Sequence, residues 1–384
     1  MLKVLYLTPN LADPAAARRI SMMRTGGASV AVAGFIRKGA ALPSLDASDV
    51  VVLGETFDGR FGQRLVAVAK ALATIMRTLG GRDVPDIIMA RNLEMLPLAN
   101  RLRALWGGHH PIVYECLDIH RLLLRQDFVG RGMRAAERYL SAPAALLTTS
   151  SPGFLRNYFD IYGGPPALIV ENKAPIGNGE RGRNPALHNV EAPLRIGWFG
   201  ALRCSRSLDA LSQLTADMGG RLEVVLRGRP ALTEFDDFHA RAAAQPGLTF
   251  AGPYRNPDDL PAIYSDVHFS WAIDFFEAGQ NSSWLLPNRL YEGCLHGAIP
   301  IAVAGTETAA FLQRHGIGLI VPDIEAETLR GTLGGLDAST VRMMAGRVAA
   351  LDPSLFSYGE ADCEALVSRL SSLRADINLA TEVA

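Results

Sequence analysis

The chain lacks any apolar run as long as the roughly 18 residues that a membrane-spanning helix requires. Its first ten residues, MLKVLYLTPN, contain only a short apolar stretch and no small-residue cleavage site, so they predict a first strand and not a signal peptide. Both absences favour a cytoplasmic protein. They also argue against a periplasmic two-lobed binding protein, which would need an export signal.

Cysteine and metal-binding patterns are scarce as well. The four cysteines are widely separated and form no CxxC pair, so we interpret them as reduced thiols in or near the cores: Cys116, Cys204, Cys294 and Cys363. The eight histidines show no HExxH spacing, and no DxD stands where a nucleotide-binding strand ends. We therefore expect no metal site.

The glycine-rich fingerprint of dinucleotide-binding proteins is also missing. The loop after the first strand, TPNLADPAAARRI, contains no GxGxxG, which argues against an NAD-dependent enzyme. Asp13 is placed to cap the helix that follows. Arg18 and Arg19, in the second turn, suit either a solvated helix face or an acceptor-binding site at the rim of the domain.

The formal net charge of −1 hides a strong asymmetry. Through Arg183 there are 23 Lys and Arg against 15 Asp and Glu, and the remainder has 15 against 24. A basic half beside an acidic half indicates that one domain meets an anionic partner. No basic run is interleaved with aromatics, so nucleic acid is a poor candidate, and an anionic membrane or a pyrophosphate-linked lipid is a better one.

The sequence does contain enough apolar residues to form two hydrophobic cores. Hydrophobic residues make up 48% and charged residues 20% of the 384, which indicates a well-packed globular protein. This length suits two domains of roughly 150–190 residues each. We place an N-terminal domain at 1–173, a linker rich in Pro, Gly and Asn at 174–193, and a C-terminal domain at 194–358.

Short apolar strands alternate with helical patterns in both halves, which predicts α/β domains with doubly wound, Rossmann-like parallel sheets. The expected strands of the first domain are Leu2–Thr8, Ser29–Gly34, Val50–Leu53, Asp86–Met89, Ile112–Glu115, Ala145–Thr149 and Ala167–Glu171. Those of the second are Leu194–Phe199, Leu222–Leu226, Leu248–Ala251, Val267–Trp271, Ile299–Val303 and Leu319–Val321. Two such domains would face each other across a cleft at the carboxyl ends of their sheets.

The segment from Asn281 to Val303, NSSWLLPNRLYEGCLHGAIPIAV, is the most informative in the chain. Pro287 suits the first turn of a helix, and Arg289 and Glu292 lie three apart on one helical face near the positive end of the helix dipole. Gly297 is suited to close the helix in a left-handed conformation. A helix start with a cation and a carboxylate suits a ligand with phosphates and a sugar hydroxyl, such as a nucleotide sugar.

This segment resembles the donor-site helix of glycosyltransferases with the GT-B fold, and the order of motifs along the whole chain is similar to that of bacterial enzymes that build exopolysaccharides of the succinoglycan type. The resemblance implies that Glu292 binds the ribose of the nucleotide and that Asn288 and Arg289 belong to the same donor site. It also implies that the last helix, near 359–384, packs back on the first domain.

The motif PIVYECLDIHRLLL at 111–124 offers candidates for a general base. Glu115, Asp118 and His120 lie at or just beyond the carboxyl end of an expected strand, where open α/β sheets place their ligands. A loop Asp at this location is the base in similar inverting GT-B enzymes, so we favour Asp118, with His120 second. The alternative is that Asp118 caps a helix over Ile119–Leu124.

The loop RIGWFGALRCSRSLDAL at 195–211 provides a glycine and two arginines. Gly200 permits close approach of the backbone, and Arg203 and Arg206 follow the strand. Similar glycosyltransferases neutralise the donor diphosphate with a cationic pair in this loop, and guanidinium groups suit bidentate phosphate contacts. The alternative is a pair of ordinary surface arginines.

Two further segments resemble parts of the donor site. Tyr254, in FAGPYRNPDDLPAIYSD, follows a strand and could stack on uracil or be an ordinary loop aromatic. Asn281 and Ser282 could hold sugar hydroxyls or phosphate, or could simply begin a helix. We leave both pairs of alternatives open.

The resemblance implies an enzyme that transfers a hexose from a nucleotide diphosphate sugar, such as a UDP-sugar, to a lipid-linked saccharide on polyprenyl diphosphate. Many retaining relatives have a second Glu seven intervening residues before the place of Glu292, but Trp284 and its neighbour Leu285 are not acidic here. This favours inversion, with no cofactor besides the donor substrate. The alternatives are a nucleotide-sugar 2-epimerase of the same fold and a non-catalytic partner of another transferase.

Two basic stretches, Arg60–Arg82 and Arg121–Arg138, mix arginines with apolar side chains. Such helices can lie on an anionic leaflet, so the protein could bind peripherally to the inner face of the cytoplasmic membrane. They could equally be amphipathic helices with solvated basic faces that pack on the sheet.

Overall fold

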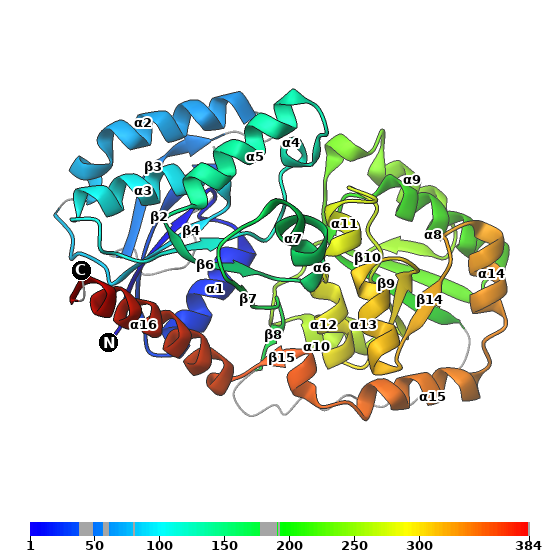
Figure 1. Ribbon diagram of the computed structural model, residues 1–384. Coiled ribbons are helices and arrows are strands. Elements are labelled where there is room, and N and C mark those ends of the chain that lie inside the picture. Colours follow the sequence, from blue (N-terminus) through cyan, green and yellow to red (C-terminus); the bar gives the residue numbers. More distant parts are fainter. Residues whose placement is uncertain (38–48, 57–60, 80, 177–189, 191–192, 383–384) are drawn as a thin grey trace. The chain divides into compact units, whose positions relative to one another are not determined.

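The computed structural model describes residues 1–37, 49–56, 61–79, 81–176, 190 and 193–382. It divides into two compact units, one of Met1–Glu171 with Gly359–Ala384 and the other of Asn172–Tyr358 (Figure 1). Most of the expected linker lies outside the described residues. Its first two residues form strand β8 (Ala174–Pro175), which pairs with β15 (Ser357–Tyr358) inside the second unit.

The first unit contains a seven-stranded parallel sheet with the order β3-β2-β1-β4-β5-β6-β7. All residues of its central strands β4 and β5 are buried, which explains their continuous apolar character. The strands are β1 (Lys3–Thr8), β2 (Ser29–Arg37), β3 (Val50–Thr56), β4 (Ile87–Arg91), β5 (Ile112–Glu115), β6 (Ala144–Thr149) and β7 (Ala167–Ile169).

Helices cover both faces of this sheet, with α2, α3 and α5 on one side and α1 and α16 on the other (Figure 1). The C-terminal helix α16 packs on α1, where a Cβ added to Gly26 would lie only 2.2 Å from the carbonyl oxygen of Cys363. The helices are α1 (Pro14–Thr25), α2 (Phe61–Leu79), η2 (Leu93–Met95), α3 (Leu96–Leu105), α4 (Arg121–Leu124), α5 (Phe128–Ser141), α6 (Pro152–Phe154), η3 (Leu155–Phe159), α7 (Asp160–Tyr162) and α16 (Glu360–Glu382).

The second unit contains a six-stranded parallel sheet with the order β11-β10-β9-β12-β13-β14. Its core packs around Trp198, Phe269 and Trp271, each fully buried. The strands are β9 (Leu194–Leu202), β10 (Leu222–Pro230), β11 (Leu248–Phe250), β12 (Phe269–Trp271), β13 (Ile299–Val303) and β14 (Leu319–Val321). The helices are α8 (Ser205–Met218), η4 (Leu232–Glu234), α9 (Phe238–Ala244), α10 (Leu260–Ser265), α11 (Asn281–Trp284), α12 (Asn288–Leu295), α13 (Glu307–His315), α14 (Ala326–Gly334), α15 (Ala338–Ala349) and η5 (Pro353–Leu355).

The predicted fold class is confirmed, because every strand expected from the sequence is present in one of two parallel, doubly wound sheets. Strands β9 and β10 run further than expected. Gly200 pairs with Gly228 in their register, and both have positive φ, 110° and 130°. A Cβ on Gly228 would lie 1.9 Å from the carbonyl oxygen of Gly200, so only glycine lets the two strands stay paired at this point.

Candidate functional site

Three charged side chains meet at the carboxyl end of the second sheet. Arg203 follows β9, Asp274 follows the neighbouring strand β12, and Arg289 is the second residue of α12. Asp274 Oδ2 accepts hydrogen bonds from Arg203 Nη2 at 3.0 Å and Nε at 3.3 Å, and it lies 3.8 Å from Arg289 Nη2. This edge of an open parallel sheet is where such folds bind ligands.

The carboxylate of Asp274 therefore lies within ion-pair distance of two guanidinium groups. Asp274 is 5% exposed and Arg289 9%, whereas Arg203 is 38% exposed. Arg289 Nη1 is buried and has no hydrogen-bond partner among the described residues. An unpaired buried donor on a charged group is costly, so this arrangement favours an additional anionic or acceptor group at Nη1.

Burial and the charges of neighbouring side chains shift the pKa values of both Asp274 and Arg289. Burial raises the pKa of Asp274, but the positive charges of Arg289 and Arg203 lower it by more than burial raises it. The pKa of this carboxyl group therefore lies below its usual value. Burial lowers the pKa of Arg289, and Asp274 offsets this only in part. Asp274 thus compensates the Arg289 cation only in part.

The start of α12 differs from our expectation in one detail. Pro287 is not in the first turn but is the extended N-cap residue, with φ −73° and ψ 148°, and α12 begins at Asn288. Among the residues that the structure describes, no side chain forms a capping hydrogen bond at the start of this helix. Because a capping side chain is missing there, the positive end of the helix dipole is left for other groups to meet at Asn288 and Arg289. Gly297 follows the helix with φ 90°, as expected for a residue that closes a helix in a left-handed conformation.

Glu292 is fixed by a residue that sequence reasoning missed. Its Oε1 accepts a 2.8 Å hydrogen bond from Asn256 Nδ2, and only 2% of Glu292 is exposed. Asn256 lies in the polar turn two residues after Tyr254. The half-buried Tyr254 ring packs edge-on against Phe199 at 6.5 Å, and a Cβ on Gly200 would lie 3.9 Å from its hydroxyl. Gly200 and Tyr254 are therefore neighbours, and their roles at a nucleotide donor stay predictions.

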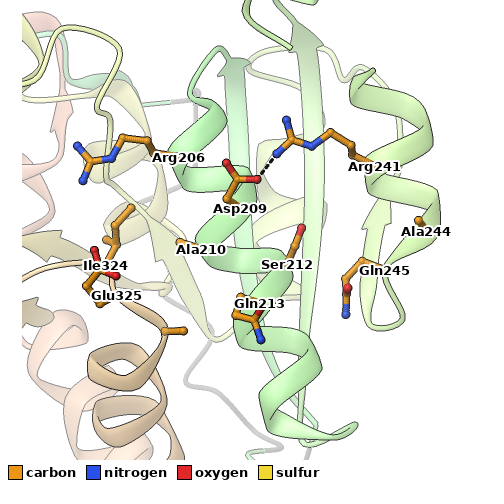
Figure 2. Close-up of a pocket in the computed structure, with 11 residues that line it drawn as sticks. Arg206, Asp209, Ala210, Ser212, Gln213, Arg241, Ala244, Gln245, Ile324 and Glu325 are labelled. Atoms are coloured by element: carbon orange, nitrogen blue, oxygen red, sulfur yellow. Dashed lines mark hydrogen bonds and ion pairs between the residues drawn. The ribbon is translucent and has the colours of Figure 1, made fainter. Parts of the chain in front are cut away.

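Arg203 and Arg206 do not form one pair. Arg203 binds Asp274, but the exposed Arg206 lies over the ring of Phe275 at 4.3 Å. Arg206 also lines an open cavity of about 630 Å³ between α8, α9 and the start of α14, whose other charged groups include the ion-paired Asp209 and Arg241 (Figure 2). The role of Arg206 at a diphosphate stays a prediction.

Asn281 and Ser282 bind their own loop. Asn281 Nδ2 donates to Glu277 Oε2 at 2.5 Å, and Ser282 Oγ accepts from the backbone N–H of Glu277 at 2.9 Å. Both residues are buried, at 2% and 6% exposure. These contacts match the helix-entry interpretation, and a role in sugar binding stays a prediction.

In the first unit, Glu115 is not an accessible base, contrary to our expectation. It is fully buried and forms ion pairs with Arg19 at 2.7 Å and Arg91 at 3.2 Å, and Tyr6 also donates to it. Burial raises the pKa of Glu115, but the two guanidinium groups lower it below its usual value. Arg19 is equally buried, so it does not lie on the solvated helix face or rim that we considered for it.

Asp118 and His120 are arranged differently from each other. His120, not Asp118, caps the short helix α4, because its Nδ1 accepts from the backbone N–H of Leu122 at 3.3 Å. The ring lone pair of His120 is thereby engaged. Asp118 is exposed, and its backbone carbonyl accepts from Cys116 Sγ. Of the two candidate bases, Asp118 is the one that solvent reaches more freely.

Sequence reasoning missed Asp274 and Asn256 because their partners are distant in the chain. The signal for Asp274 was its place three residues beyond β12, in WAID, beside a polar loop. Among the described residues, no group of three or more His, Cys, Asp and Glu is placed to hold a metal ion. Within the same residues, no helix is both long and apolar enough to cross a membrane.

No protein-family model matches the chain. The chain is 51% identical over 379 residues to succinoglycan biosynthesis protein ExoL of Rhizobium meliloti (strain 1021), covering 97% of this chain and 94% of the relative. Its fold is similar to that of sucrose-phosphate synthase from Thermosynechococcus elongatus, with a TM-score of 0.71, 13% identity and coverage of 98% and 100% of the two chains. It is also similar to Anabaena Alr3699/HepE in complex with UDP and glucose, with a TM-score of 0.68, 17% identity and coverage of 97% and 100%. The chain therefore belongs to the family of succinoglycan biosynthesis protein ExoL and has the fold of the GT-B glycosyltransferases.

Proposed function

We propose that the protein is a glycosyltransferase of exopolysaccharide biosynthesis that transfers a hexose from a nucleotide diphosphate sugar to a lipid-linked saccharide, with inversion at the anomeric carbon. The observation that carries this proposal is the buried Nη1 of Arg289, unpartnered among the described residues, beside the Asp274–Arg203 ion pair. Two guanidinium groups against one carboxylate leave one positive charge that this carboxylate does not neutralise.

A diphosphate fits this excess charge. Arg289 Nη1 would bind a phosphate oxygen, the half-exposed Arg203 would exchange part of its contact with Asp274 for a second one, and the uncapped start of α12 would add its dipole. The leaving nucleoside diphosphate gains negative charge as the glycosidic bond breaks. Fixed cations at this place therefore stabilise the transition state more than the bound substrate.

The nucleoside would be held next to the diphosphate. Glu292 is oriented by Asn256, and a carboxylate can accept several hydrogen bonds at once, which suits the hydroxyls of a ribose. Tyr254 would lie against the base, where Gly200 leaves room because it has no side chain. Uridine is the nucleoside that we propose, because the similarly folded Anabaena protein was solved with UDP and with UDP-glucose.

The first unit would supply the acceptor side of the reaction. The exposed carboxylate of Asp118 would take the proton from the acceptor hydroxyl as that oxygen attacks the anomeric carbon. The bond to the diphosphate oxygen breaks as the new glycosidic bond forms. A carboxylate at the place of Trp284 or Leu285 is missing, which supports inversion with one base.

A two-step experiment tests the proposal on the full chain. UDP, UDP-glucose, GDP-mannose and ATP are first compared for the rise in melting temperature that they cause. We expect a rise with UDP and the UDP-sugar, and a rate of nucleoside diphosphate release from the donor that increases when a lipid-linked acceptor extract is added. No rise with any nucleotide would overturn the donor site. Rapid donor consumption without any acceptor would favour the 2-epimerase alternative.

A further inference from the structure

One surface of the first unit carries positive charge without any exposed acidic residue on its helices. Helices α2, α3 and α5 lie on the same face of the sheet (Figure 1). Their sequences contain eight basic residues and one acidic residue, Glu137. Glu137 is only 5% exposed and accepts hydrogen bonds from Tyr114 and Tyr158, so it points into the protein.

Helix α5 presents two large exposed aromatics on this surface. Phe128 is 75% exposed and Tyr139 80%. They are eleven residues apart, so they lie on one stripe of the helix about 16 Å from each other. The positions between them on the stripe are small, Gly132 and Ala135, and both are exposed. The stripe is therefore flat, with one aromatic near each end.

Exposed arginines lie beside this stripe. Arg131 and Arg138 follow one edge of it on α5. Arg101, on the adjacent helix α3, is exposed next to Asn100, whose Nδ2 donates to the α5 carbonyl of Leu140 at 2.8 Å. Two other arginines on these three helices form hydrogen bonds within the first unit. Arg134 donates to the backbone carbonyls of residues 123 and 125, and Arg103 donates to that of residue 110.

We propose that this surface, defined by Arg101, Phe128, Arg131, Arg138 and Tyr139, docks on an anionic lipid bilayer. The aromatic stripe would enter the headgroup region and the arginines would contact lipid phosphates, which is how amphipathic basic helices lie on membranes. The basic stretches of the sequence already suggested such a role, although Arg60 and the side chain of Arg64 lie outside the described part of the structure. The stripe on α5 was not visible from composition alone.

The choice of a bilayer rests in part on the proposed lipid-linked acceptor, but the test needs neither donor nor acceptor. The full chain is sedimented with vesicles of phosphatidylcholine alone and with an equimolar mixture of phosphatidylcholine and phosphatidylglycerol. We expect binding to the mixed vesicles only, weakened by salt. The double variant Arg131→Gln with Arg138→Gln should bind roughly thirtyfold less, from the usual contribution of each basic residue near an anionic surface.

The aromatic pair is tested separately. Phe128→Ser with Tyr139→Ser should abolish the binding that remains at high salt, while the melting temperature stays unchanged because both side chains are exposed. The matched control, Arg330→Gln with Arg342→Gln, removes the same charge from exposed positions on α14 and α15 and should bind like the wild type. Three results would overturn the proposal. They are equal binding to neutral and anionic vesicles, vesicle binding by both surface variants that equals that of the wild type, and binding to double-stranded DNA in place of vesicles.

Discussion

Asn256 Nδ2 donates a 2.8 Å hydrogen bond to Glu292 Oε1, which fixes the orientation of a carboxylate that is almost completely buried on α12. A loop between β11 and α10 is thereby joined to the helix that carries Arg289. Glu292, the residue proposed to bind the ribose, is therefore held in one orientation before any ligand arrives. This lowers the conformational entropy that is lost when the ligand binds.

Asn256→Ala should weaken UDP binding by about tenfold, because a hydrogen bond to a charged group contributes roughly 1.5–3 kcal/mol and the carboxylate loses its orientation. Calorimetric titration of UDP measures the effect. The matched control is Asn157→Ala, which removes the same amide group from an exposed position in the first unit and should leave UDP affinity unchanged. Equal affinities for the wild type and both variants would remove Asn256 from the site.

Asp274→Asn should lower the free energy of unfolding by about 3–5 kcal/mol, because it leaves two guanidinium groups without their shared carboxylate. Added pyrophosphate should restore part of the melting temperature, since it replaces the lost negative charge. A thermal unfolding series with and without pyrophosphate checks both effects. A variant that is destabilised but gains nothing from pyrophosphate would show that Asp274 acts only in structure.

Asp118→Asn should lower kcat by about two to four powers of ten, the usual contribution of a general base, while UDP affinity stays the same. Release of nucleoside diphosphate with a lipid-linked acceptor extract provides the rate. His120→Gln is the comparison, and we expect the smaller effect there because His120 Nδ1 caps α4. If Asp118→Asn turns over normally, the base lies elsewhere even though the fold is correct.

Acid should destabilise the first unit through Glu115. Its pKa is lower in the folded protein than the ordinary value of 4.5, so the ion pairs with Arg19 and Arg91 contribute fully above that value and are lost as the pH falls through the lowered pKa. Glu115→Gln should cost about 3–5 kcal/mol at neutral pH and less as the pH falls. Denaturant unfolding of both proteins from neutral to acidic pH measures the difference. A cost that is independent of pH would contradict the assignment of charge to Glu115.

The fold was predictable because its signals are local. Strand and helix alternate in the sequence with their own periodicities, and each buried strand is a short apolar run. The sheet topology confirms the predicted fold class, and the 51% identical relative confirms the exopolysaccharide family. The ion-pair partners were not predictable in this way. Asp274 lies 71 residues from Arg203, and Glu115 lies 96 from Arg19, so only the folded sheet brings them together. The burial of Glu115 could not be read from its place at the end of an expected strand.

The start of α12 shows a finer limit of sequence reasoning. Proline is favoured in the first turn, but its fixed φ also suits the residue just before a helix, and here Pro287 takes that second place. Arg289 lies in the first turn in either case, and as the second residue of α12 its Nη2 lies 3.8 Å from Asp274 Oδ2.

Arg289 is the residue proposed to bind the diphosphate of the donor, and a calorimetric titration of UDP into the wild type, Arg289→Gln and Arg330→Gln tests this role. We expect Arg289→Gln to lose at least about tenfold in affinity, since a buried charge-assisted contact is removed, whereas Arg330→Gln, which removes the same charge from an exposed position on α14, should match the wild type. An affinity of Arg289→Gln equal to that of the wild type, with both proteins folded, would contradict the account.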